Sequence, residues 1–173
     1  MVSEERKEEL LKVLEAHGKF FGAFDGGKIT IKESDDLSSV YAEGCTLKAH
    51  APLWGNKPGK EPLLTVPELR KRLGTAFKFV ALHPSGMHVA SKEDSIALFY
   101  HAKLKLRFFP FFYMMNVPLI FVVDYVETDK GLRIKQFNEY PTKSREEATE
   151  KLIGLGWPKD TKFEKRLVLN AKD

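Results

Sequence analysis

The stretch that decides the fold is LIFVVDYVETDKGLRIKQFNEY, residues 119–140. It predicts two β-strands joined by a glycine-containing turn, because apolar and polar residues alternate on both sides of the turn. Asp124 interrupts an otherwise apolar run in the first strand, and Glu139 comes just before the tyrosine that ends the second. An acid in a strand with the pattern of a buried one is either a structural residue or part of a site.

Length and composition are those of an ordinary globular protein. The chain has 173 residues, 43% of them apolar and 30% charged, which favours one domain with a real core. Its net charge of +4 is small and spread along the chain, so it favours neither nucleic acid nor an anionic membrane. Cys45 is the one cysteine, which excludes an internal disulfide and fits a reducing compartment.

The N-terminal segment is too charged for a signal peptide. No apolar run reaches the roughly 18 residues that a membrane-spanning helix needs. We therefore expect a cytoplasmic protein.

The spacing of apolar residues changes partway along the chain. Amphipathic spacing and capping patterns predict helices over residues 3–24, 34–41, 65–73 and 144–155. Between residues 77 and 142 the period falls to two, which predicts antiparallel strands, with one hairpin folded about residues 110–116. Helices followed by strands indicate an α+β fold, in which three N-terminal helices pack on a curved antiparallel sheet around a cone-shaped cavity.

Three stretches resemble the nuclear transport factor 2-like (NTF2-like) superfamily, which includes SnoaL-like polyketide cyclases, ketosteroid isomerases and scytalone dehydratases. They are VYAEGCTLKAH, the helix over residues 65–73 and FVVDYVETDKGLRIKQFNEYPT. The resemblance implies a cystatin-like, NTF2-like domain over residues 1–142, with 143–173 as its C-terminal helical extension. It also implies cofactor-free cyclisation, dehydration or isomerisation of a polyketide-like or terpenoid-like carbonyl compound.

Two carboxyl groups are the first catalytic candidates. Asp124 resembles the acid with which ketosteroid isomerases hold an enolate oxygen, and Glu139 resembles the acid/base of the cyclases. Strand alternation puts Phe137 and Glu139 on one face, and a hairpin would bring Asp124 within about 5–8 Å of Glu139. Arg133 and Lys135 share that alternation, so Glu139 could instead face water and pair with them. The other role for Asp124 is a structural one.

Two histidines are the next candidates. His101 lies in a strand similar to the one that carries the eliminating histidine of scytalone dehydratases. His50 follows Ala49, which stands where the isomerases keep their general base. The helix-one tyrosine of the isomerases corresponds to Lys19 or Phe20, so isomerase activity on steroids is not expected. No histidine and acid have metal-site spacing, so we expect no metal and no cofactor.

Large apolar side chains form the expected walls of the cavity. They are Phe20, Phe24, Trp54, Phe99, Tyr100, Val122, Val126 and Phe137. The segment FFPFFYMMNVP, residues 108–118, is an unusually aromatic turn for this family. It either folds back onto the core or forms a dimer contact; contact with a membrane is the less favoured alternative.

The sequence therefore predicts a homodimer that binds an apolar small molecule in the cavity and acts on it by acid/base chemistry. Two other classes of function stay open. One is a non-catalytic carrier of a hydrophobic ligand, and the other is a dimeric interaction module whose cavity is filled by its own side chains. A nucleic-acid partner is not expected.

Overall fold

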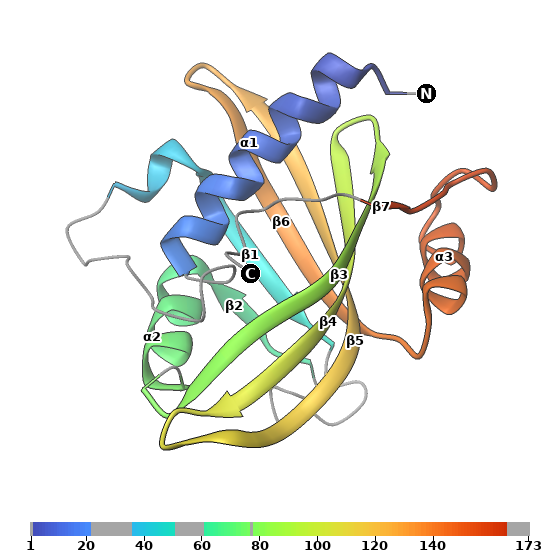
Figure 1. Cartoon of the computed structure of the whole chain (residues 1–173). Helices are drawn as coiled ribbons and strands as arrows, with labels where there is room; N and C mark the ends of the chain where they lie inside the picture. The colour runs from blue at the N-terminus through green and yellow to red at the C-terminus, as the bar shows by residue number, and fades with distance from the viewer. Residues whose placement is uncertain (1, 22–35, 51–60, 77, 166–173) are drawn as a thin grey trace.

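The computed structural model describes residues 2–21, 36–50, 61–76 and 78–165, and within them all side chains except those of Phe21 and residues 110–115. Three α-helices and seven strands make up the described fold (Figure 1). In chain order they are α1 (Glu4–Phe21), the 3-10 turn η1 (Leu37–Ser39), β1 (Tyr41–Ala49), β2 (Leu63–Thr65), α2 (Val66–Ala76), β3 (Val80–Lys92), β4 (Ser95–Leu106), β5 (Phe109–Thr128), β6 (Gly131–Pro141), α3 (Arg145–Gly154) and β7 (Glu164–Lys165).

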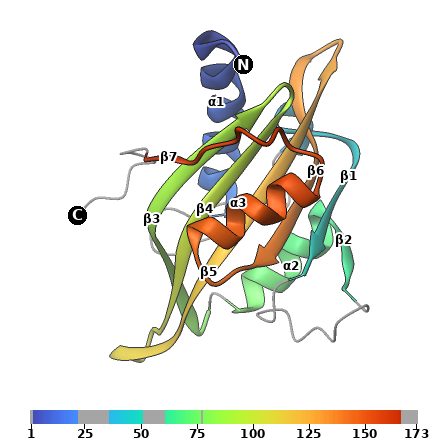
Figure 2. The ribbon, with the colours of Figure 1, turned by 90° about the vertical axis from the view of Figure 1, so that its right-hand side faces the viewer.

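The strands form one sheet in the order β2-β1-β6-β5-β4-β3-β7. All neighbours run antiparallel except β1 and β6, which are parallel. The sheet is curved, with α1 and α2 on one face and α3 on the other (Figures 1 and 2). We call these the α1 face and the α3 face. An α+β architecture is thus confirmed.

The α1 face carries the main core. Leu10 and Leu14 of α1 are fully buried against Val123 of β5 and Phe137 of β6. Leu69 brings α2 into the same cluster. Burying large apolar side chains of this kind contributes about 1.5–3 kcal/mol each, so this face holds most of the apolar stabilisation.

A smaller core fixes α3 to the opposite face. Ala148 and Leu152 are fully buried against Ile120 and Val122 of β5, and Trp157 closes the cluster. The helix begins where the sequence predicts, because the Ser144 hydroxyl accepts a hydrogen bond from the Glu147 amide at 3.3 Å.

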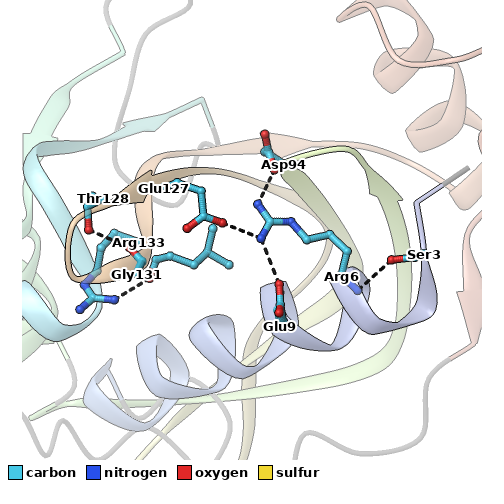
Figure 3. Close-up of polar contacts among 9 residues, drawn as sticks. Ser3, Arg6, Glu9, Asp94, Glu127, Thr128, Gly131 and Arg133 are labelled. Carbon is cyan, nitrogen blue, oxygen red and sulfur yellow. Dashed lines mark hydrogen bonds and ion pairs between the residues drawn. The ribbon is translucent and has the colours of Figure 1, made fainter.

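Arg6 ties the first turn of α1 to two strand ends (Figure 3). Its guanidinium donates to Asp94 after β3 at 2.6 Å, to Glu127 of β5 at 2.7 Å and to Glu9 at 3.0 Å. The side chains of Asp94 and Glu127 are about 60% exposed, so solvent screens these pairs and each contributes little free energy. Their effect is to fix the direction in which α1 crosses the sheet.

The helix predicted over residues 65–73 is confirmed as α2, together with its capping box. The Thr65 amide donates to the Glu68 carboxylate at 2.8 Å, and the Glu68 amide donates back to the Thr65 hydroxyl at 3.4 Å. The prediction of three N-terminal helices is wrong. In the described part of residues 34–41 the turn η1 leads into β1 at Tyr41, and Asp36 accepts from the Ser38 amide at 2.9 Å. Such side-chain bonds favour a turn over a helix, and the third helix is the C-terminal α3.

The hairpin predicted about residues 110–116 is also misplaced. Leu106 pairs with Phe109, so the turn between β4 and β5 is at Arg107 and Phe108, and the aromatic segment after it is strand. Aromatic and β-branched residues favour extended backbone, which explains why the strand continues through this stretch. As a result, His101 lies opposite Pro118, whereas Asp124 lies opposite Ser95.

The α3 core generates a stability prediction. Leu152→Ala should lower the free energy of unfolding by about 2–5 kcal/mol, because it leaves a cavity against β5. Leu155→Ala, a change in the same helical segment at a side chain that is 45% exposed, is the matched control and should change it by under about 1 kcal/mol. Urea denaturation of the two variants measures both. Equal losses would mean that α3 does not pack on the sheet in solution.

Candidate functional site

The pairing of β5 with β6 decides which side chains reach the interior. Phe121 lies opposite Glu139, and Val123 lies opposite Phe137. Val123 and Phe137 belong to the core on the α1 face, and Phe121 packs against it. Glu139 shares their alternation, so its carboxyl group lies on the α1 face, as the sequence predicts.

A β-bulge in β6 excludes the alternative that Glu139 faces water beside Arg133 and Lys135. Asp124 pairs with Gln136, but the next residue, Tyr125, pairs with Ile134, so Lys135 is an extra residue in β6. A bulge of this kind reverses the alternation on one side of it. Ile134 is fully buried and Lys135 is exposed, whereas the uninterrupted alternation would have turned Lys135 inward.

Glu139 is buried in this position, with 8% of its surface exposed. The Tyr100 hydroxyl from β4 donates to its Oε1 at 3.3 Å. Burial, and then the neighbouring Glu139 carboxylate, raise the pKa of Tyr100 well above its ordinary value. The hydroxyl therefore keeps its proton at neutral pH and remains a hydrogen-bond donor.

A second polar pair lies on the same face. His17 of α1 and Tyr41 of β1 are both buried, and the His17 Nδ1 is 2.7 Å from the Tyr41 hydroxyl oxygen. The imidazole stacks on Phe121 with ring centres 5.7 Å apart, and its centre lies 5.2 Å from that of Phe137. These two rings flank Glu139, one across the sheet and one two residues before it.

Burial lowers the pKa of His17 to about 4, so the imidazole is neutral at pH 7. Burial also raises the pKa of Tyr41. Two arrangements of the hydrogen bond are then available. If Tyr41 donates to Nδ1, His17 carries its proton on Nε2; if Nδ1 donates, Nε2 carries the lone pair and the Tyr41 oxygen is the acceptor. The pair can adopt either arrangement without a change of charge.

Glu139, Tyr100, His17 and Tyr41 thus come from β6, β4, α1 and β1, and all lie on the α1 face. An acid that can accept a proton and hydroxyl groups that can donate hydrogen bonds are the groups that acid/base chemistry on a carbonyl compound requires. We call these four residues the interior cluster.

Asp124 lies on the other face, so the prediction that it meets Glu139 in one cavity is wrong. The Ser95 hydroxyl of β4 donates to Asp124 Oδ1 at 2.7 Å. On β6, Asp124 lies opposite Gln136. Burial raises the pKa of Tyr140 on this face, and Asp124 adds to the rise. Counting residues around the turn could not reveal this arrangement, because the bulge in β6 changes which side chains share a face.

The two predicted histidines also lie on the α3 face. The His50 ring stacks on Tyr140 at 4.4 Å, with the planes 12° apart, and its Nδ1 is 3.7 Å from a Glu61 oxygen. Burial lowers the pKa of His50, and Glu61 opposes the shift. His101 packs edge-on against Phe99 at 5.6 Å. The sheet separates both histidines from the interior cluster.

The expected cavity walls divide between the two faces. Phe20, Tyr100 and Phe137 belong to the core on the α1 face or pack against it, whereas Phe99 and Val122 belong to the α3 core. Val126 lies opposite Arg133 and is in neither of the described clusters. Phe24 and Trp54 lie outside the described residues.

Sequence reasoning missed His17 and Tyr41, although the sequence carries a signal for the first. His17 follows Leu10 and Leu14 at helical spacing, so it lies in the apolar stripe of α1. A titratable side chain in such a stripe is directed at the core. Tyr41 could not be found, because the segment before it carries helix-capping signals.

Elsewhere in the described chain, two pockets of about 530 and 380 Å³ adjoin the start of α1. They are lined by Arg6, Lys7 and residues 89–94, among others, and by no member of the interior cluster. Within the same described ranges, no three side chains of the metal-binding types converge, and no helix is long and apolar enough to cross a membrane.

Comparison with known proteins places the fold. No family model and no curated protein matches the chain. Among solved structures, the BvnE pinacolase from Penicillium brevicompactum is similar at 12% identity and a TM-score of 0.51, over 90% of this chain and 97% of that one. An NTF2-like protein of unknown function from Pseudomonas putida KT2440 is similar at 7% identity and a TM-score of 0.50, over 85% and 94%. This protein therefore has the NTF2-like fold, as its resemblance to that superfamily implies.

Proposed function

We propose that this protein binds an apolar carbonyl compound between α1 and the sheet and acts on it by cofactor-free acid/base chemistry. The observation that carries the proposal is the buried Glu139 carboxyl with its Tyr100 donor, placed beside aromatic rings on the α1 face. Burying an ionisable group has a free-energy cost, so a fold that retains one among apolar residues favours a functional role for it.

The chemical step begins with enolisation. The Glu139 carboxylate takes a proton from the carbon next to the carbonyl group; the C–H electron pair forms a C=C bond, and the C=O π pair moves onto the carbonyl oxygen. A hydroxyl donor of the interior cluster, Tyr41 or Tyr100, then hydrogen-bonds the enolate oxygen. Returning the proton to another carbon gives isomerisation. Loss of a β-hydroxyl as water, with the proton returned by Glu139, gives dehydration; attack of the enolate on a second carbonyl, whose oxygen takes that proton, gives cyclisation.

Substrates of this kind are polyketide-like or terpenoid-like, because the surrounding side chains are aromatic and aliphatic. The similar structure from Penicillium is a pinacolase, so the fold also occurs in an enzyme. The alternative to an enzyme is a carrier that binds the same class of compound without turnover. Both functions require ligand binding on the α1 face, and only the first requires the Glu139 carboxylate.

Proton abstraction can be tested without the natural substrate. The wild-type protein should catalyse exchange of the α-protons of β-tetralone, an apolar ketone, with deuterated water, as followed by NMR. Glu139→Gln should slow this exchange by about 10²–10⁴-fold, because the amide cannot take the proton, while ketone affinity stays within a few-fold.

Asp124→Asn is the matched control, since it makes the same carboxylate-to-amide change on the neighbouring strand β5, three positions from the residue opposite Glu139 and on the other face. It should leave exchange within a few-fold of wild type. An equal loss in both variants would contradict the assignment of Glu139 as the base. If wild-type exchange is no faster than in buffer although the ketone binds, the protein is a carrier.

The burial of His17 predicts a pH-dependent stability. The unfolded chain protonates this imidazole near pH 6.5 and the folded chain only near pH 4, so the unfolded state binds more protons between these values. Folding stability due to His17 is therefore complete above pH 6.5 and is lost as the pH falls toward 4. The full difference corresponds to about 3 kcal/mol.

Urea denaturation at pH 7 and pH 5 measures this contribution. From pH 7 to pH 5, the free energy of unfolding should fall by about 2 kcal/mol more in the wild type than in His17→Gln, because glutamine does not titrate. His101→Gln, at a partly exposed histidine on the α3 face, controls for the loss of a histidine. An identical pH dependence in wild type and His17→Gln would show that His17 is not buried in solution.

A further inference from the structure

Three phenylalanines are exposed together at one end of the sheet. Phe79, Phe108 and Phe109 have 56%, 72% and 66% of their surface exposed. They are neighbours, because the Arg107 amide donates to the Phe79 carbonyl at 2.9 Å and Leu106 pairs with both Val80 and Phe109. We call these three residues the aromatic tip. Soluble monomers rarely expose several large rings side by side, so such a patch indicates a contact surface.

The charge that is spread along the sequence is not spread evenly in the fold. Residues 69–91 and 95–123, which include most of α2, nearly all of β3, all of β4 and the greater part of β5, contain no acidic residue. They contain seven basic residues: Arg70, Lys71, Arg72, Lys78, Lys103, Lys105 and Arg107. The remaining chain has 21 basic and 24 acidic residues, so its net charge is −3.

Four of these basic residues lie on the segments that lead to the aromatic tip. Lys78 and Arg107 are exposed and adjoin Phe79 and Phe108 in the chain. Lys105 and Lys103 follow on β4, opposite Ala81 and His83 of β3. The β4–β5 turn projects from the end of the sheet in both views (Figures 1 and 2). The tip is therefore an aromatic projection with basic residues behind it.

We propose that the aromatic tip docks on an anionic lipid surface. Phenylalanine rings partition into the boundary between headgroups and acyl chains, and nearby lysine and arginine side chains are attracted to anionic headgroups. Charge complementarity identifies this occupant. A second copy of the chain, meeting tip to tip, would bring the like charges of Lys78 and Arg107 from both copies together, which opposes association. This proposal is independent of the interior cluster and of any catalytic activity.

Vesicle flotation tests the proposal. The wild-type protein should float with vesicles containing about 30% phosphatidylserine in phosphatidylcholine, and about tenfold less with phosphatidylcholine alone. About 0.5 M salt should reduce binding to the anionic vesicles, because it screens the basic residues. Replacing all three phenylalanines of the tip by serine should lower the partition coefficient by tenfold or more, since the rings no longer insert.

Matched variants distinguish binding through the aromatic tip from nonspecific binding of the protein to vesicles. Phe108→Ser is compared with Leu155→Ser, which also removes an exposed apolar side chain, but from the end of α3. The double change Lys78→Glu, Arg107→Glu is compared with Lys159→Glu, Lys162→Glu, at four basic residues that are all exposed. Only the first variant of each pair should lose vesicle binding, and thermal melting checks that all of them fold.

Three results would overturn the proposal. The first is equal binding to neutral and anionic vesicles, or no binding to either. The second is unchanged binding after the three phenylalanines are replaced. The third comes from light scattering: a dimer of the wild-type protein that Phe108→Ser converts to a monomer would assign the tip to a second copy of the chain.

Discussion

The pairing of Phe121 with Glu139 is the contact on which the interior of this protein depends. Strand alternation then fixes every neighbour: Phe137 and Val123 must face α1, and Asp124 and Tyr140 must face α3. A slip of one residue would turn Asn138 toward α1 in place of Glu139 and Phe137 toward α3. The large apolar area on the α1 face opposes such a slip, so the same packing that stabilises the fold also holds the carboxyl group in place.

The bulge at Lys135 allows β6 to bury Phe137 and Glu139 although the same strand carries Arg133 and Lys135 near its turn. The sequence of β6 alternates basic and apolar residues toward its turn, and without the extra residue Lys135 would point into the core. With it, Ile134 is buried beneath α1 and Arg133 instead donates to the Ser38 carbonyl at 2.6 Å. One inserted residue thus separates the polar turn from the apolar interior.

Local signals in the sequence predicted the helices α1, α2 and α3, the four long strands and the inward direction of Glu139. Capping boxes and two-residue alternation are short-range patterns, and the structure confirms both at Thr65, Ser144 and Phe137. The errors concern longer-range facts. The face of Asp124 depends on a bulge in the neighbouring strand, and the length of β5 depends on where the β4–β5 turn forms. No local pattern encodes the face of Asp124 or the length of β5. The contact of His17 with Tyr41 also joins residues far apart in the chain, so no local pattern encodes it.

The parallel pair of β1 and β6 has a consequence for how the chain reaches this structure. A ribosome makes β1 long before β6, and in the described sheet β1 has only the three-residue β2 on its other side. Until Gly131–Pro141 has been synthesised, both β1 and β5 present an open edge to other chains. Synthesis of β6 closes both edges at once, so a nascent chain that stalls before it exposes two unpaired strands and is most prone to aggregate at that point.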